Sequence, residues 1–112
     1  MSAITTHVLD TSRGSPAAGV RVELHRRSGE SWKSIGEGRT DANGRCQNLS
    51  AGAAIEAGTY RLLFHASAYY GALGVETFYS EIPIIFELRD ATAHYHVPLL
   101  LSPFGYSTYR GS

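Results

Sequence analysis

The stretch "VRVELH", residues 20–25, alternates apolar and polar side chains with a strict period of two. Val20, Val22 and Leu24 are its apolar members, and a charged residue or a histidine follows each of them. Successive side chains of an extended strand point to opposite faces, so this pattern is typical of a strand that buries one face. We therefore predict a half-buried β-strand here.

Related stretches on both sides of this strand extend the pattern. Alternating or β-branched runs predict further strands at residues 4–9, 31–38, 59–65, 81–88 and 94–101. Only residues 67–74, "SAYYGALG", predict a short helix. Many short strands with frequent turn signals are typical of a sandwich and not of alternating strands and helices. We predict an all-β fold, a two-sheet antiparallel sandwich of about eight strands in a single domain of residues 1–112.

Turn and proline signals refine this prediction. In "TDANGRC", residues 40–46, Asn43 and Gly44 form a pair that favours a tight hairpin turn directly before Arg45. Pro83 and Pro98 fall inside two of the predicted strands. Proline has no backbone N–H to donate to a neighbouring strand, so each of these strands is expected to lie at a sheet edge or to contain a bulge.

Composition excludes several classes of protein. Ten basic residues balance ten acidic ones among 112 residues, so a nucleic-acid partner or an anionic membrane is not expected. A formal net charge of zero also mildly favours self-association. The single cysteine, Cys46, excludes an internal disulfide. No apolar run is long enough to span a membrane and no leader pattern opens the chain, so we expect a soluble, cytoplasmic protein.

The five histidines of the sequence are the main candidates for proton chemistry near neutral pH. His94 and His96 stand two residues apart, so both side chains should lie on the same face of a strand. Three interpretations remain open for this pair: packing or surface histidines, a three-ligand zinc site completed by His7, and acid–base catalysis. The other two histidines are expected to be surface or packing residues. The histidines are His7, His25, His65, His94 and His96.

Other chemical signatures are few. The sequence has no glycine-rich phosphate loop, no G-x-S-x-G elbow and no H-E-x-x-H motif. Cys46 follows Arg45, but a lone cysteine in a strand-rich region is typically buried and unreactive. Arg39 and Arg45 flank the turn, and the planar donor fork of an arginine suits flat, oxygen-rich or anionic ligands. The residue pattern alone thus indicates a sandwich with an undecided histidine site.

Three stretches resemble the signatures of the 5-hydroxyisourate hydrolases, the enzymatic members of the transthyretin family. They are "THVLDTSRGSPAAGVRVEL" (residues 6–24), "TDANGRC" (40–46) and "HYHVPLLLSPFGYSTYRGS" (94–112). The final Y-R-G-S is the most specific element, because hormone-carrying transthyretins lack it. The resemblance implies a transthyretin-like sandwich that assembles as a homotetramer, a dimer of dimers, with active sites where the dimers meet.

The same resemblance implies a function and a set of site residues. The expected reaction is hydrolysis of 5-hydroxyisourate to 2-oxo-4-hydroxy-4-carboxy-5-ureidoimidazoline in urate degradation, with no metal or cofactor. The family positions correspond to His7, Arg45, His96 and Tyr109 as catalytic residues, and to Ser112 as a further substrate-binding residue beside His7, Arg45 and Tyr109. Which histidine is the general base stays open. Two alternatives are a carrier of a small aromatic ligand without catalysis, and a zinc hydrolase built on His7, His94 and His96.

Overall fold

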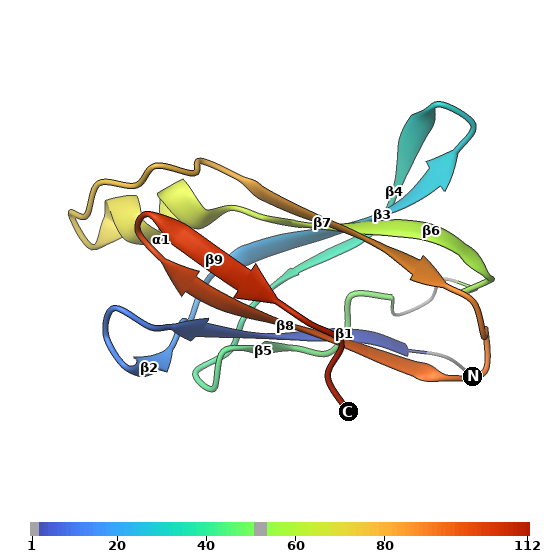
Figure 1. The fold of residues 1–112 in the computed structure, drawn as a ribbon, viewed down its shortest axis with the longest axis horizontal. Helices are drawn as coiled ribbons and strands as arrows, with labels where there is room; N and C mark the ends of the chain where they lie inside the picture. The colour runs from blue at the N-terminus through green and yellow to red at the C-terminus, as the bar shows by residue number, and fades with distance from the viewer. Residues whose placement is uncertain (1–2, 51–53) are drawn as a thin grey trace.

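Two β-sheets face each other in the computed structural model, which describes residues 3–50 and 54–112 (Figure 1). Within these residues the strands are β1 (Ala3–Asp10), β2 (Ser15–Pro16), β3 (Arg21–Ser28), β4 (Ser31–Arg39), β5 (Arg45–Cys46), β6 (Gly58–Phe64), β7 (Ile82–Leu88), β8 (His94–Ser102) and β9 (Gly105–Thr108). The helix α1 (Ala66–Ala72) lies at one end of the sandwich and overlaps the helix predicted at residues 67–74. No helix in the described part of the chain is both apolar and long enough to cross a membrane.

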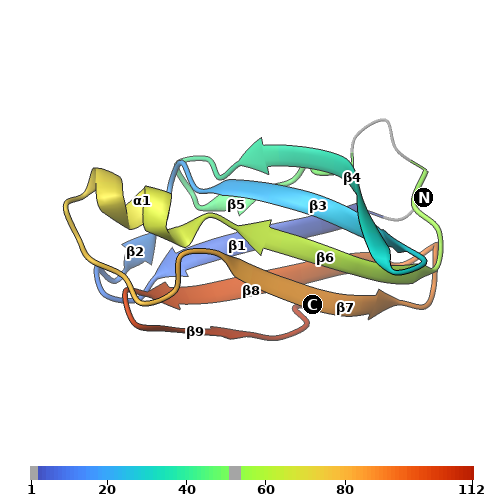
Figure 2. The ribbon, with the colours of Figure 1, turned by 90° about the horizontal axis from the view of Figure 1, so that it is seen from above.

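The strands divide between a five-stranded and a four-stranded sheet (Figure 2). The first has the order β2-β1-β8-β9, with β5 also paired to β1, and the second has the order β4-β3-β6-β7. All pairs are antiparallel except β1 with β8, which run parallel from Ala3 opposite His94 to Asp10 opposite Leu101. The all-β sandwich prediction is therefore confirmed, with one parallel pair that the local pattern did not indicate.

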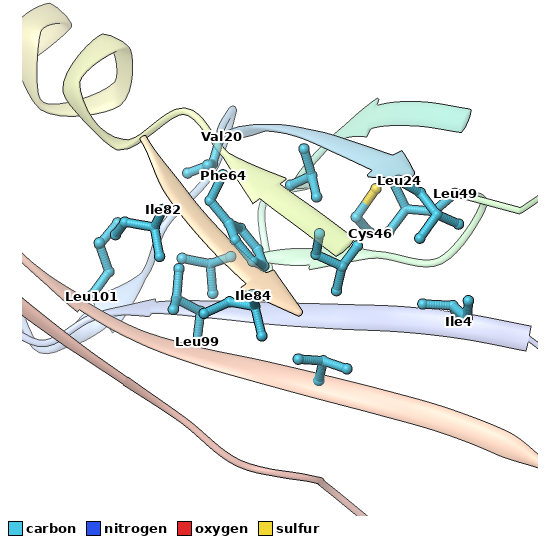
Figure 3. Packing of buried hydrophobic residues seen from close by; sticks show 14 of the residues in the cluster. Ile4, Val20, Leu24, Cys46, Leu49, Phe64, Ile82, Ile84, Leu99 and Leu101 are labelled. Carbon is cyan, nitrogen blue, oxygen red and sulfur yellow. The ribbon is translucent and has the colours of Figure 1, made fainter. Parts of the chain in front are cut away.

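The core lies between the sheets and is built mainly from alternate residues of the longer strands, with contributions from α1 and the loops (Figure 3). Val22 and Leu24 are fully buried, as their alternation in "VRVELH" predicts. Leu99 and Leu101 of β8, in the other sheet, are also fully buried. Burying one such side chain contributes about 1.5–3 kcal/mol, so these alternating positions hold the two sheets together.

The proline predictions had different outcomes. Pro83 lies in β7, which pairs only with β6 and is an edge strand, so that prediction is confirmed. The prediction for Pro98 is wrong, because β8 lies between β1 and β9 and its register with both strands is unbroken. The proline is tolerated because the continuous ladder with β9 ends at the pair of Leu99 with Thr108, and the next bridge on that side joins His96 to Gly111, so Pro98 itself does not have to donate an N–H. The Thr108 hydroxyl donates to the Pro98 carbonyl at 2.7 Å.

The turn in "TDANGRC" forms, but it does not make a hairpin. Gly44 adopts φ 76°, a left-handed conformation that glycine accepts without strain, and its N–H donates to the Asp41 carbonyl at 2.9 Å. The strands on either side, β4 and β5, belong to different sheets. The turn therefore carries the chain from one sheet to the other and places Arg45 beside β1.

Candidate functional site

The candidate site lies on the outer face of the five-stranded sheet, where β1, β5 and β8 are neighbours. Thr5 of β1 pairs with His96 of β8, and His7 pairs with Pro98 on one side and with Arg45 of β5 on the other. Side chains two apart in a strand share a face, so Thr5 and His7 lie on one side of β1. The core-facing residues of these strands, including Ile4, Cys46 and Val97, alternate with the outward-facing site residues.

Thr5 joins the two histidines of β8. Its Oγ1 atom lies 2.9 Å from Nε2 of His94 and 2.8 Å from Nδ1 of His96. Thr5 is only 8% exposed, whereas His94 is exposed and His96 is half-buried. The prediction that the two histidines share a face is confirmed. Sequence reasoning missed Thr5, although its position two residues before His7 in an extended stretch would have placed it on the same face.

Arg45 is held at the site by the turn that precedes it. The Asp41 carboxylate Oδ1 accepts backbone N–H groups from Asn43 at 2.8 Å and from Arg45 at 3.0 Å. Gly44 packs so closely that a Cβ atom on it would lie 2.4 Å from the Val8 carbonyl oxygen. The guanidinium makes no ion pair at 4.0 Å or less within residues 3–50 and 54–112. It is therefore available to a bound ligand.

The last residues return to β8 after β9 has ended. Gly111 forms an isolated antiparallel bridge with His96 and donates its N–H to the His96 carbonyl at 2.8 Å. This bridge brings Ser112 to the rim of the site. These groups enclose an open pocket of about 410 Å³, lined by Thr5, Thr6, Arg45, Gln47, His94, His96 and Ser112.

The electrostatic setting of His96 disfavours its protonated form. Burial lowers the pKa of His96, and the neighbouring charges of Arg45, His7 and His94 lower it further. All four influences act against the imidazolium form. A neutral imidazole in a pocket with a free guanidinium can accept a proton from water.

Tyr109 lies elsewhere in the single chain. It is 59% exposed and lines a separate groove of about 370 Å³ between β7 and β8, together with Arg110 and the apolar residues Ile84 and Ile85. The Arg110 guanidinium in this groove stacks 4.4 Å from the centre of the Tyr95 ring. The structure thus brings together Arg45, His96 and Ser112 with His7 beside them, and it does not bring Tyr109 into that pocket.

The remaining chemical candidates lie in the surrounding structure. Cys46 is buried, and burial raises the pKa of its thiol, as expected for an unreactive cysteine. His25 is buried against Arg61, which donates to its Nδ1 at 3.0 Å, and His65 contacts Glu23 at 2.6 Å. His25 is thus a packing residue, and His65 lines a separate cleft near α1.

The geometry does not support the three-histidine zinc alternative. No three histidine, cysteine or acidic side chains come together to hold a metal ion in the part of the chain that the structure describes. His94 and His96 each direct one ring nitrogen to Thr5. A larger cleft of about 730 Å³ lies between α1 and β2, but it contains none of the predicted site residues.

Comparison with known proteins identifies relatives along nearly the whole chain. The model of the HIUase/Transthyretin family matches residues 4–111. A probable 5-hydroxyisourate hydrolase of Caenorhabditis elegans is 49% identical over 111 residues, which cover 99% of this chain and 82% of the relative. The solved structure of Klebsiella pneumoniae 5-hydroxyisourate hydrolase is 38% identical with a TM-score of 0.88, covering 100% of both chains. Sea bream transthyretin in complex with thyroxine is 32% identical with a TM-score of 0.90, covering 96% of this chain and 93% of that one.

Proposed function

Because the chain belongs to the HIUase/transthyretin family, we propose that it is a hydrolase that opens the ring of 5-hydroxyisourate in urate degradation. The observation that carries this proposal is the convergence of three groups in one open pocket: His96, whose pKa is lowered, Ser112, and Arg45, whose guanidinium forms no ion pair within residues 3–50 and 54–112. That set can bind a flat, carbonyl-rich ring and also activate water beside it.

Arg45 acts as the binding and charge-stabilising group. Its planar donor fork matches a ring edge with adjacent carbonyl oxygens, and its charge offsets the negative oxygen that develops when a carbonyl is attacked. The turn fixed by Asp41 and Gly44 holds the Arg45 backbone in place before substrate binds. With the backbone already fixed, only the Arg45 side chain has to be ordered around the substrate.

His96 acts as the general base. It takes a proton from water while the water oxygen forms a bond to a ring carbonyl carbon, which gives a tetrahedral oxyanion. Collapse of this intermediate breaks the ring C–N bond, and His96 returns its proton to the leaving nitrogen. The lowered pKa of His96 supports this role because the free imidazole is then the major form at neutral pH. His7 adjoins the site and orients the substrate. Tyr109 lines a separate groove of its own chain, so its hydroxyl donates a hydrogen bond to substrate from a neighbouring subunit of the assembly.

The working protein is a homotetramer, a dimer of dimers with its sites where dimers meet. The edge strands β7 and β9 lie along the same side of the sandwich and both line one groove with β8 (Figure 2). Several large apolar or aromatic side chains near these edges are exposed, which favours association by strand pairing and burial. They include Phe78, Ile85, Phe104, Tyr106 and Tyr109.

A non-catalytic carrier is the second candidate, because transthyretin in complex with thyroxine has the same fold. One experiment separates the two functions. Purified protein is added to freshly prepared 5-hydroxyisourate and the ultraviolet absorbance decay is followed beside a His96→Asn control. We expect catalytic decay with the wild type and near-buffer rates with the variant. Decay at the buffer rate with the wild type, at concentrations where it binds an aromatic ligand, would support the carrier.

A further inference from the structure

We propose that Thr5 and His94 are positioning residues that fix the tautomer of His96, with a proton on Nδ1 and a free lone pair on Nε2. This inference rests on the proposed function and assigns the atom that receives the proton. It begins from the Thr5 hydroxyl, which lies within hydrogen-bond distance of one nitrogen of each ring.

Counting protons limits the possible arrangements. A threonine hydroxyl has one proton and two acceptor lone pairs, and a neutral imidazole has one N–H and one acceptor nitrogen. Two contacts to one hydroxyl therefore require at least one ring to donate. Either His96 donates from Nδ1 while Thr5 donates to His94, or His94 donates from Nε2 while Thr5 donates to His96. Of these two arrangements, only the first leaves Nε2 of His96 able to accept a proton.

The surroundings favour that first arrangement. Nε2 of His96 forms no hydrogen bond within residues 3–50 and 54–112, and Arg45 lines the same pocket. A lone pair beside a guanidinium is electrostatically better than an N–H dipole directed at it. If both rings donated instead, the hydroxyl proton of the nearly buried Thr5 would lack an acceptor among the described residues, which is costly.

The same contacts then serve the reaction. When Nε2 of His96 takes the proton from water, the ring becomes an imidazolium, and its Nδ1–H bond to Thr5 becomes charge-assisted and stronger. The hydroxyl proton stays directed at Nε2 of His94, so no second proton moves. Thr5 thereby orients the base as a carboxylate would, but without adding a negative charge to a site that must bind a substrate rich in carbonyl groups.

Paired substitutions test this inference. Thr5→Val keeps the shape but removes the hydroxyl, and Thr5→Ser restores it. We expect Thr5→Val to lower kcat about tenfold to a hundredfold with KM changed less than about twofold, and Thr5→Ser to recover most of the rate. His94→Phe should lower kcat. His94→Gln should lower it less, because the glutamine side-chain oxygen can accept the Thr5 hydroxyl proton in place of Nε2. Thr59→Val, on β6, removes a comparable strand hydroxyl bonded to Glu87 and is the control.

A spectroscopic measurement separates this inference from the proposed function. Carbon and nitrogen NMR shifts of the His96 ring report its tautomer without any substrate. We expect the Nδ1–H form in the wild type and in Thr5→Ser, and a change toward the Nε2–H form in Thr5→Val. An Nε2–H form in the wild type would overturn the inference, as would full activity of Thr5→Val or equal losses in Thr5→Val and Thr5→Ser. Absence of hydrolysis with the expected tautomer would instead reject the proposed function alone.

Discussion

Gly111 lies against the imidazole ring of His96 so closely that a Cβ atom on Gly111 would sit 2.7 Å from Cδ2 of His96. The same atom would lie 3.2 Å from Cγ of Pro98, whose ring is rigid. Gly111→Ala should therefore displace either the terminal segment or the His96 ring. We expect kcat/KM to fall about tenfold to a hundredfold, the scale of a misplaced catalytic group.

Gly105→Ala is the matched control for this substitution. A Cβ atom on Gly105 would meet only Oγ of Ser102 at 3.6 Å, an ordinary contact. Turnover and circular dichroism should be measured for both variants. Equal activity of Gly111→Ala and the wild type would show that the close approach of Gly111 to His96 has no catalytic consequence.

Removing the site histidines should slow chemistry without unfolding the protein. We expect His96→Asn and His7→Asn each to lower kcat/KM on the order of a hundredfold, the usual scale for a lost acid–base or positioning group. His25→Asn should lower the melting temperature, because His25 is buried against Glu23 and Arg61, but it should leave kcat/KM of the folded protein nearly unchanged. Equal losses of kcat/KM in all three variants would indicate general destabilisation.

The pH dependence of the rate follows from the state of His96. Its pKa is lowered from 6.5, so the base stays neutral to a lower pH than a free histidine would. The acid limb of kcat/KM should rise with pH and have its midpoint below 6.5. A flat profile, or a midpoint at or above the ordinary histidine value, would contradict a base role for His96.

Arg45→Gln tests one cause of that pKa shift. Removing the positive charge should raise the His96 pKa, although it should stay below the ordinary value because burial is the largest cause. The acid limb should move to higher pH, and NMR titration of the His96 ring should show the same shift. Arg39→Gln, on the other side of the turn and outside the pocket, should leave the midpoint unchanged. A lower His96 pKa in Arg45→Gln would refute this electrostatic account.

The terminal segment should be needed for catalysis more than for folding. Deleting residues 109–112 removes the Gly111 bridge and Ser112, but none of these residues belongs to the buried core. We expect the deletion to abolish hydrolysis while circular dichroism and sedimentation stay close to the wild type. Tyr109→Phe should lower kcat/KM about fivefold, the scale of one lost hydrogen bond. An active deletion variant, or one that is inactive because it has unfolded, would contradict this expectation.

The sequence pattern predicted the strands well because a half-buried strand shows its period locally. Val22 and Leu24 are buried where the alternation placed them, and the helix starts within one residue of its predicted position. The pattern could not show which strands pair, because pairing depends on residues far apart in the chain. It therefore missed the parallel pair of β1 and β8 and expected Pro98 in an edge strand. It also predicted a hairpin at Gly44, where the chain instead crosses from one sheet to the other.

The site was predicted in part for the same reason. His96, Arg45 and Ser112 line one pocket, as their correspondence to the family signatures implies. Thr5 has no motif of its own, and its contacts with His94 and His96 exist only once β1 and β8 lie side by side. The place of Tyr109 in a different groove could not be foreseen, because that groove forms only where β7, β8 and the residues after β9 come together.

The parallel pairing of β1 with β8 also decides when the pocket can exist during synthesis. Thr5 is separated from His94 by 89 residues and from His96 by 91 residues. A ribosome-bound chain can thus form its early strands, but Thr5 cannot contact His94 or His96 until β8 has emerged. Contacts of such long sequence separation form late, because closing a long loop costs entropy. Turnover measured during translation would therefore report completed chains and not partly synthesised ones.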